Sequence, residues 1–455
     1  MRDSIFRKYD IRGVYPRDLD RDTVVRLGIA LGRMAGDKLC VGRDVRRSGP
    51  QLLQWLAQGA ESAGSSVMDL GVQTTPMTYY AAHALRPFAT VMITGSHNPP
   101  EYNGFKIMEG LHTLYGERIQ ELADEMRTIE VPQELGPPRM EPRDISREYA
   151  DRLVSEFAFP RSLHVVVDGG NGTGGEVACQ VLKRLGCRVT ELFCRPDGSF
   201  PNHHPDPTVL ENLSELRSTV IRQKADMGIA FDGDADRLGV VDERGEVIFG
   251  DRVLTVLARA LLKERPGATV ISEVKASRLF FSEVERAGGR AVMSPTGHSI
   301  IKERMAQEDA MLAGEMSGHI FFRDRYLGFD DALYAALRLI EVTADSGGTL
   351  SSLTANFPQL CATPEIRQEY AEEQKFEVVD IVRRRLLDEG HRVIDIDGVR
   401  VEFEDGWGLL RASNTQPVVV MRFEAETPEA LERYRNMICE YLEAAGRGTD
   451  EQGGS

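Results

Sequence analysis

Short strand-like runs alternate with helix-like runs over the first three quarters of the 455-residue chain. Apolar stretches at residues 38–42, 66–70 and 89–93 are typical of strands, and helical patterns lie between them. Such alternation is typical of βα units, in which helices cover a mostly parallel sheet. The sequence therefore predicts an α/β fold for this part of the chain.

The length predicts about three or four domains, at roughly 100–200 residues each. A polar stretch at 131–146 contains four prolines and predicts the first linker, followed by a connecting helix. A second unit opens with a strand at 163–168 and closes with a hairpin-like pair. A third holds two helices around a strand at 269–274. We expect domain limits at residues 1–146, 147–250, 251–361 and 362–455.

The last quarter has a different pattern. Residues 399–404 alternate apolar and charged side chains, which indicates a half-buried strand, and 417–423 reads as another strand. Residues 428–442 show one apolar stripe at helical spacing. This pattern predicts a separate α+β domain, with a disordered tail at 447–455.

The composition excludes several classes of protein. The chain is 42% hydrophobic and 28% charged, and its net charge is −16. An acidic chain lacks the basic face that nucleic acids or anionic membranes require, so we expect neither as a partner. No apolar run approaches the length of a membrane span, and no signal peptide is visible. The six cysteines show no regular pairing, which is typical of a reducing, cytoplasmic compartment.

Ser96 lies in the run Thr-Gly-Ser-His-Asn-Pro at 94–99, directly after the strand at 89–93. A Gly and an Asn-Pro turn at a strand end favour a serine that faces a cleft. A plain surface turn is the alternative. Read with the acidic loop downstream, Ser96 is a candidate for a nucleophile that carries a phosphoryl group.

The acidic loop Asp-Gly-Asp-Ala-Asp-Arg at 232–237 sets Asp232, Asp234 and Asp236 at a tight bend. Three converging carboxylates repel one another unless a cation neutralises them, and oxygen ligands suit Mg²⁺, Mn²⁺ or Ca²⁺. A calcium EF-hand is disfavoured because Arg237 stands where that loop needs Gly. A metal-free acidic turn is the other alternative. A methyl group at Ala235 is expected to be tolerated if φ is negative there.

Two further motifs carry polar groups suited to a sugar phosphate. Arg411, Ser413, Asn414 and Thr415 offer a guanidinium fork and neutral donors for a phosphate, although a plain hairpin turn has a similar composition. Glu315 and Ser317 alternate, so in an extended segment both would face one side, with His319. A Gly-rich bulged strand is the alternative there. The loop at 169–175 is interpreted as a tight strand-to-helix turn and not as a dinucleotide site.

Taken together, the motifs at 94–99, 232–237, 314–319 and 411–415 resemble those of the α-D-phosphohexomutase superfamily, in its phosphomannomutase/phosphoglucomutase branch. The segments at 6–13, 196–207 and 295–302 support the resemblance, which covers nearly the whole chain. It implies four domains around a central cleft, three of them related α/β units. It also implies reversible phosphate transfer between O1 and O6 of a hexose phosphate, through a 1,6-bisphosphate.

The resemblance implies a role for each motif. Ser96 would be the phosphoserine, and Asp232, Asp234 and Asp236 would bind Mg²⁺ with it. Glu315 and Ser317 would contact the sugar, and Arg411 to Thr415 the distal phosphate. Further residues match positions that line the family's cleft: Tyr9, Arg12, Lys106, Arg237, Lys275, His298 and His319. Lys106 and His319 are the candidates for general acid/base work, with Arg12 beside them.

Several alternatives remain open on the sequence. A phosphoglucosamine mutase uses a similar motif set, a phosphatase would release phosphate from Ser96 to water, and a sugar-phosphate sensor would not turn over. No motif distinguishes mannose from glucose. We expect small sugar phosphates as ligands and a monomer or weak dimer.

Overall fold

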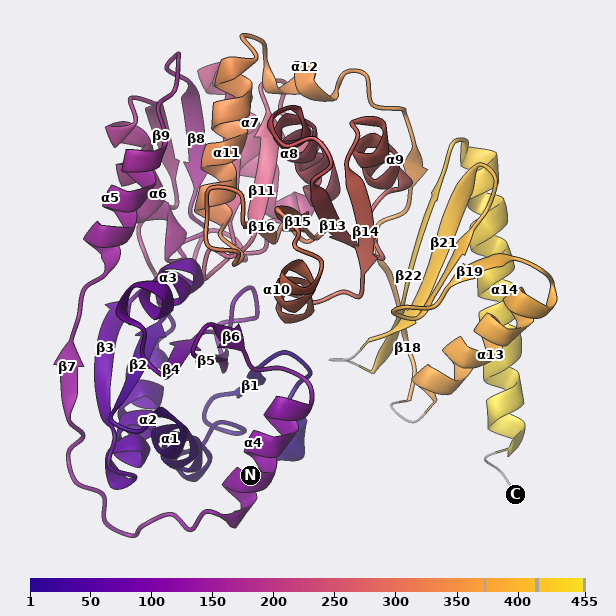
Figure 1. The fold of residues 1–455 in the computed structure, drawn as a ribbon. Coiled ribbons are helices and arrows are strands. Elements are labelled where there is room, and N and C mark those ends of the chain that lie inside the picture. The colour runs from indigo at the N-terminus through magenta and orange to yellow at the C-terminus, as the bar shows by residue number, and fades with distance from the viewer. Residues whose placement is uncertain (372–373, 414–416, 453–455) are drawn as a thin grey trace.

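The computed structural model describes residues 1–371, 374–413 and 417–452, with side chains described through residue 446. Four sheets and their helices form four domains (Figure 1). Three are α/β and the last is α+β, which confirms the predicted fold class. The fourth domain lies beside the third, at the right of Figure 1.

The first domain is built on a sheet with the order β1-β5-β4-β2-β3-β7, with β6 paired to β5. β4, β2, β3 and β7 run parallel, while β5 is antiparallel to both β4 and β1. The predicted linker contains a short strand, β7, because its backbone pairs with β3. The strands are β1 (Ile11–Val14), β2 (Lys38–Arg43), β3 (Ser66–Val72), β4 (Ala89–Ile93), β5 (Tyr102–Glu109), β6 (His112–Thr113) and β7 (Met140–Pro142). The helices are η1 (Asp3–Ile5), α1 (Arg21–Ala35), α2 (Gly49–Ser62), α3 (Thr75–Leu85) and α4 (Glu117–Thr128).

The second domain follows the connecting helix α5 (Ser146–Glu156). Its sheet has the order β12-β11-β10-β8-β9. β10, β8 and β9 are parallel, and β10 and β11 form the antiparallel pair that the sequence predicts. The strands are β8 (His164–Asp168), β9 (Arg188–Leu192), β10 (Met227–Phe231), β11 (Leu238–Asp242) and β12 (Val247–Ile248). The helices are α6 (Gly174–Arg184), η2 (Leu210–Leu213) and α7 (Ser214–Gln223).

The third domain has the sheet order β14-β13-β15-β16, in which only the β15–β16 pair is antiparallel. The strands are β13 (Thr269–Glu273), β14 (Arg290–Ser294), β15 (Leu312–Gly314) and β16 (Ile320–Phe322). The helices are α8 (Gly250–Glu264), α9 (Arg278–Arg286), α10 (His298–Gln307), α11 (Ala332–Asp345) and α12 (Leu350–Thr354).

The fourth domain has an antiparallel sheet of order β17-β22-β21-β20-β19, with β18 also paired to β22. The strands are β17 (Cys361–Ala362), β18 (Ile366–Glu369), β19 (Arg392–Ile394), β20 (Val399–Glu402), β21 (Gly406–Ala412) and β22 (Val418–Ala425). The helices α13 (Lys375–Asp388) and α14 (Pro428–Gln452) pack on this sheet (Figure 1). The predicted disorder from residue 447 is wrong as far as Gln452, because α14 continues to that residue; residues 453–455 lie outside the described ranges.

Each α/β sheet is mixed and not purely parallel, because one of its parallel strands is followed in the chain by a strand that pairs with it in the antiparallel direction. The returning loops lie between β4 and β5, β10 and β11, and β15 and β16. These loops are residues 94–101, 232–237 and 315–319, and they carry the predicted motifs. The fold thus presents each motif at the same place in its domain.

Candidate active site

The Ser96 loop is held in place by a buried ion pair. Asp44 accepts a hydrogen bond from Thr94 Oγ1 at 2.7 Å, and Arg46 Nε donates to Asp44 at 3.1 Å. Arg46 also donates to the backbone carbonyls of Ser96 at 2.8 Å and Asn98 at 2.6 Å. Arg46 is only 1% exposed, and its donors support the serine loop.

Ser96 and the acidic loop meet across a domain boundary. Ser96 Oγ donates to Asp232 Oδ2 at 2.7 Å and lies 3.0 Å from His97 Nδ1. The other oxygen of Asp232 accepts from the backbone N–H groups of Asp236 and Arg237 at 3.1 and 3.2 Å. Asp232, Asp234 and Asp236 are fully buried. The structure thus brings the predicted nucleophile to the predicted metal ligands.

Two residues complete this group. Thr75, at the start of α3, donates through Oγ1 to Asp234 Oδ2 at 2.6 Å. Lys106 Nζ lies 2.8 Å from Asp234 Oδ2 and also contacts Asp236. Thr75 is absent from the sequence-based site, since a Thr-Pro pair at a helix start signals only a helix terminus.

The acidic loop holds more negative charge than Lys106 neutralises. Burial and the charges of Asp234 and Asp236 raise the pKa of Asp232 well above its usual range. Burial alone would lower the pKa of Lys106, but Asp234 and Asp236 outweigh it, so that pKa is well above its ordinary value. One ammonium group therefore faces three carboxylates.

The donor set fits a hard divalent cation. The three carboxylates place an oxygen each within 4.8 Å of one another. Asp234 Oδ1 and Asp236 Oδ1 are buried and have no hydrogen-bond partner. Unpaired buried carboxylate oxygens in an all-oxygen site are the ligands that Mg²⁺ or Ca²⁺ takes.

Ala235 adopts φ of 58°, in the left-handed region. The condition under which its methyl group is expected to be tolerated, a negative φ, is therefore not met, and the loop holds a strained alanine. The turn at 169–175 buttresses it: Thr173 N–H donates to the Gly233 carbonyl at 3.1 Å. As interpreted from the sequence, this turn joins strand β8 to helix α6.

Basic and imidazole groups surround the serine. Arg12, on strand β1, donates through Nη1 to Asn98 Oδ1 at 2.9 Å. Arg237 Nε donates to His319 Nε2 at 3.1 Å. The rings of His319 and His298 stack with centroids 5.5 Å apart. These groups form a wall of the site that adjoins the acidic loop, because His319 Nδ1 lies 3.6 Å from Asp236 Oδ1.

Glu315 and Ser317 lie in a tight turn and not in an extended segment. The N–H of Glu315 donates to the His319 carbonyl at 2.8 Å, which closes the turn between β15 and β16. Ser317 Oγ donates to Glu315 Oε2 at 3.0 Å, and Gly297 N–H donates to Oε1 at 2.6 Å. The two side chains meet because the chain folds back, so the predicted common face with His319 is wrong.

Contacts link this turn to the remaining predicted residues. Tyr9 OH donates to the Thr296 carbonyl at 2.6 Å, and Thr296 N–H donates to Asp397 at 3.0 Å. Asp397 in turn lies 3.2 Å from Arg411 Nη2. Lys275 Nζ lies 2.8 Å from Glu365.

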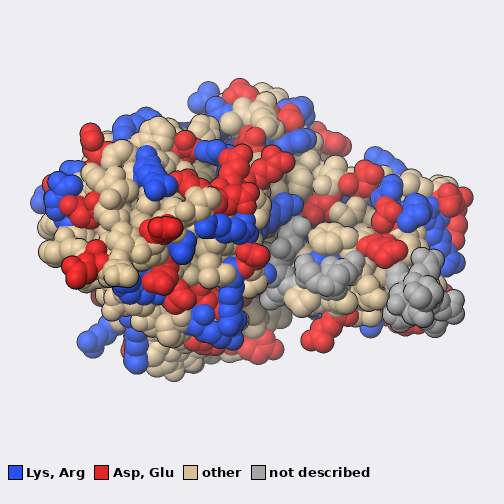
Figure 2. All heavy atoms as spheres, turned by 90° about the horizontal axis from the view of Figure 1, so that it is seen from below, with Lys and Arg blue, Asp and Glu red and all other residues tan. Residues whose placement is uncertain are grey.

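The fourth-domain motif is described in part. Ser413 N–H donates to the Val418 carbonyl at 2.9 Å, at the end of the β21–β22 hairpin. Asn414 and Thr415 lie outside the described residues. Figure 2 shows a hollow between the smaller lobe, which is the fourth domain, and the larger body.

Comparison with known proteins decides the family. Family models match four consecutive parts of the chain: phosphoglucomutase/phosphomannomutase α/β/α domains I, II and III at residues 3–131, 147–245 and 249–361, and the C-terminal domain at 365–441. The chain belongs to this family. It is a phosphohexomutase, an isomerase of the α-D-phosphohexomutase superfamily.

The relatives of this phosphohexomutase carry two names. A phosphomannomutase/phosphoglucomutase of Pseudomonas putida is 45% identical over 440 residues, covering 96% of this chain and 95% of the relative. A phosphoglucomutase of Neisseria gonorrhoeae is 44% identical and covers 97% of each chain. A solved phosphoglucomutase/phosphomannomutase family protein of Burkholderia thailandensis has a TM-score of 0.91 at 41% identity, covering 98% of this chain and 99% of that one. Within its described residues, the phosphohexomutase has no helix that is both long and apolar enough to cross a membrane.

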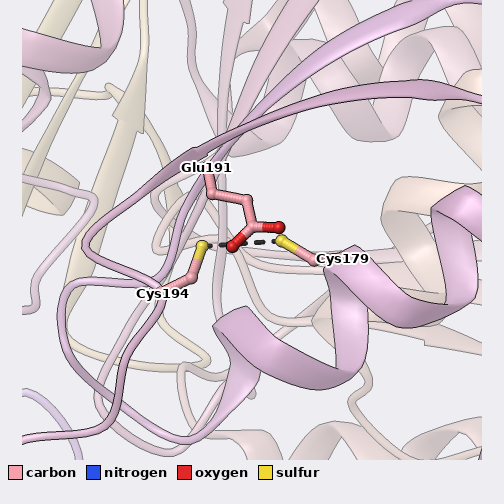
Figure 3. A group of neighbouring side chains, drawn as sticks. All are labelled: Cys179, Glu191 and Cys194. Atoms are coloured by element: carbon pink, nitrogen blue, oxygen red, sulfur yellow. Dashed lines mark hydrogen bonds between the residues drawn. The ribbon is translucent and has the colours of Figure 1, made fainter.

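A second group of metal-ligand type in the phosphohexomutase involves Cys179, Glu191 and Cys194 (Figure 3). The sulfurs of Cys179 and Cys194 lie 3.6 Å apart, and Cys194 Sγ donates to the Val167 carbonyl at 3.4 Å. The hydrogen bond to Cys194 and burial raise the pKa of Cys179, and Lys183 Nζ pairs with Glu191 at 2.5 Å. The raised pKa of Cys179 and the ion pair of Glu191 with Lys183 favour a packing role over metal binding.

Proposed function

We propose that this phosphohexomutase exchanges a phosphoryl group between Ser96 and a hexose phosphate. In the first half-reaction, the phosphorus–oxygen bond to Ser96 Oγ breaks as a bond forms to the free hydroxyl of a hexose 1- or 6-phosphate. The hydroxyl proton passes to a base, and a hexose 1,6-bisphosphate results. In the second half-reaction Ser96 takes the other phosphate. The 2.7 Å contact of Ser96 Oγ with the buried acidic loop carries this proposal.

We propose Mg²⁺ as the ion held by Asp232, Asp234, Asp236 and an oxygen of phosphorylated Ser96. The ion would draw negative charge from the phosphoryl group during transfer. Lys106 contacts two of these carboxylates, and its raised pKa keeps it protonated. We therefore assign Lys106 to charge stabilisation or proton donation, since a protonated amine cannot accept a proton.

We assign the remaining residues to binding. Glu315 and Ser317 form a carboxylate–hydroxyl pair that suits adjacent sugar hydroxyls. Arg411, Ser413, Asn414 and Thr415 would hold the phosphate that does not react, with Lys275, Tyr9, His298 and Arg237 along the same wall. Asp397 pairs with Arg411, and Glu365 pairs with Lys275, so a bound phosphate would compete with these carboxylates. Arg12 would support the serine loop through Asn98.

We propose mannose and glucose phosphates as substrates, because the relatives at 44–45% identity carry both names. A phosphoglucosamine mutase and a sugar phosphatase are the alternatives. Comparing rates on mannose 1-phosphate, glucose 1-phosphate and glucosamine 1-phosphate with magnesium distinguishes the sugars. Phosphate release without isomerisation would identify a phosphatase. We further propose a cytoplasmic monomer or weak dimer, which cell fractionation and sedimentation test.

Ser96→Ala tests the covalent route. We expect turnover to fall by at least about 10³-fold, because the group that forms the covalent intermediate is lost. Intact-protein mass spectrometry after incubation with glucose 1,6-bisphosphate should show one added phosphoryl group on the unaltered protein and none on the variant. Ser317→Ala is the matched control, since it removes a nearby hydroxyl and should leave phosphorylation of Ser96 intact. Full activity of Ser96→Ala would exclude the proposed route.

A further inference from the structure

Asp330 is a buried carboxylate that lies next to the stacked rings of His298 and His319. Asp330 lies just before α11 and is fully buried. Its backbone forms an isolated β-bridge with Phe321 of strand β16. Its oxygens lie 3.1 Å from His319 Nδ1, 3.7 Å from His298 Nδ1 and 3.2 Å from Lys302 Nζ. No motif singles it out in the sequence.

The tautomer of His319 follows from its two neighbours. Arg237 Nε, which can only donate, points to His319 Nε2 at 3.1 Å, so Nε2 is the accepting nitrogen. The proton of the neutral ring therefore lies on Nδ1, the nitrogen that faces Asp330. Asp330 and Arg237 act on opposite ends of the ring, and Asp330 is the nearer of two carboxylates to Nδ1, since Asp236 Oδ1 lies 3.6 Å away.

Asp330 is an anion in this setting. Burial alone would raise its pKa, but Lys302, His319 and His298 outweigh burial and hold the pKa well below its usual range. Lys302 is fixed from its other side by the ring of Tyr79, 4.1 Å from the ammonium to the ring centroid. The carboxylate thus has a defined position and charge.

A second metal ion is the competing explanation, because Asp236, His319 and Asp330 offer ligand atoms within 4.8 Å of one another. Asp236 is already a ligand of the ion proposed for the acidic loop, and Lys302 Nζ lies 3.2 Å from Asp330. A second cation would have to share Asp236 and would meet Lys302, so the geometry favours an orienting role.

We propose that Asp330 is a positioning residue that fixes the ring orientation and tautomer of His319 and so holds Arg237 in place at the Ser96 site. The proposal rests on the proposed function for its effect on turnover. Its direct consequence is a property of the His319 ring that exists without any reaction.

The adjacent Asp331 provides a matched control. Its carboxylate accepts from Tyr326 OH at 2.6 Å and from Tyr149 OH at 2.9 Å, and it caps α11 through Tyr334 N–H at 2.9 Å. It is as buried as Asp330 but supports the helix and not the histidines. Asp330→Asn and Asp331→Asn therefore separate positioning from folding.

The test measures His319 by nitrogen-15 NMR, with the resonances assigned by His319→Gln, alongside kinetics on glucose 1-phosphate with magnesium. For Asp330→Asn we expect loss of the uniform Nδ1–H tautomer of His319 and a fall in kcat of about 10–100-fold, the range found for groups that orient metal-binding histidines, with KM changed less than about 3-fold. Asp331→Asn should keep the tautomer and lower the urea midpoint. An unchanged His319 tautomer in Asp330→Asn would overturn the proposal, whatever its activity.

Asp330→Asn leaves the Lys302 ammonium buried without its carboxylate partner, which can prevent the variant from folding well enough to measure; a second variant keeps the test valid in that case. Asp330→Asn/Lys302→Met removes both charges and should show the same change in tautomer. Lys302→Met alone keeps the carboxylate and should retain the Nδ1–H form. If Ser96→Ala were fully active, the proposed function would fail while the tautomer result still decided the role of Asp330.

Discussion

Two residues of the site hold backbone conformations that their side chains disfavour. Ser96 has φ of 48° and Ala235 has φ of 58°. A residue other than glycine in this region costs roughly 1–2 kcal/mol, so the surrounding contacts must hold both loops. Arg46 does so for the serine loop, and the turn at 169–175 does so for the acidic loop. In these strained conformations the two loops place Ser96 and the aspartates at one site.

Ala235→Gly tests the strain in the acidic loop. The change relieves roughly 1–2 kcal/mol of backbone strain, which stabilises the folded chain. It also removes a buried methyl group, worth about 0.8 kcal/mol, and gives the unfolded chain more conformational freedom, and both of these effects destabilise the folded chain. We expect the free energy of unfolding to change by less than about 1 kcal/mol and magnesium-dependent activity to persist. Urea denaturation and a magnesium titration measure these.

Gly174→Ala is the partner change, because a Cβ at Gly174 would lie 2.7 Å from that of Ala235. It should impair the loop, and Ala235→Gly should relieve part of that damage in the double variant. Strictly additive effects would show that the two loops are not in packed contact.

At this scale the sequence identifies the reactive residues but not their supports. Ser96 and the three aspartates stand out because their types and spacing form motifs. Arg46, Thr75 and Asp330 do not, since a lone Arg, Thr or Asp has the same local pattern on a surface. Their contacts span 50 residues in sequence from Arg46 to Ser96 and 159 from Thr75 to Asp234, and only the folded chain reveals them.

At the scale of elements, each described functional loop is the connection of an antiparallel pair. This holds for β4–β5, β10–β11 and β15–β16, and β21 and β22 form the corresponding pair in the fourth domain. Strand and helix runs were predictable from apolar periodicity. The antiparallel returns were predicted only for β10–β11, because strand direction depends on pairing partners that periodicity does not reveal.

A polar joint connects the third and fourth domains near Lys275. Arg400 Nη1, from β20, donates to the carbonyls of Val274 and Ala276 at 2.7 and 2.8 Å. Its guanidinium lies 3.9 Å from the centroid of the Trp407 ring, and Trp407 Nε1 donates to Glu424 at 2.8 Å. The fourth domain thus holds the loop that carries Lys275.

Arg400→Met should weaken this joint. Two buried carbonyls lose a donor, and we expect the free energy of unfolding of the fourth domain to fall by about 3 kcal/mol, with a higher KM for sugar phosphate as Lys275 is released. The chain has two tryptophans, Trp55 and Trp407, so Trp407 fluorescence in a Trp55→Phe background reports on the joint. Arg384→Met, at an arginine whose side chain is 61% exposed, should leave both measurements unchanged. Equal effects of the two variants would contradict the role of Arg400.

At the scale of the whole molecule, one continuous apolar core joins the first three domains, while a small separate cluster lies at the joint with the fourth. The first includes Met77, Val165 and Val270; the second is Val274, Trp407 and Leu409. Sequence periodicity predicted apolar strand and helix runs but not which domains share a core. That division follows from long-range packing, and it leaves the fourth domain with the smallest apolar attachment.

Acid should weaken the molecule through His83, a half-buried histidine that packs on Phe329 of the shared core. Burial, and then repulsion by Arg86 and Arg152, lowers the pKa of His83 to about 4. The unfolded chain binds a proton at this histidine below about pH 6.5, while the folded chain does not until about pH 4, so stability falls as the pH falls through this window. For a half-buried ring we expect about 1–2 kcal/mol after solvent screening.

His203 provides a control of opposite sign. Burial alone would lower its pKa, but the hydrogen bond with Asp168 raises it. Its contribution is therefore fully present below about pH 6.5 and is lost as the pH rises through its folded-state pKa. Urea midpoints at pH 7 and pH 5 should converge in His83→Gln and separate further in His203→Gln, because each variant removes one of two opposing effects. The rings of His83 and Phe329 pack with centroids 5.5 Å apart, and this packing is expected to exclude the charged form of His83. If His83→Gln and the unaltered protein had the same pH dependence, His83 would be protonated as readily in the folded chain as in the unfolded one, which would contradict this expectation.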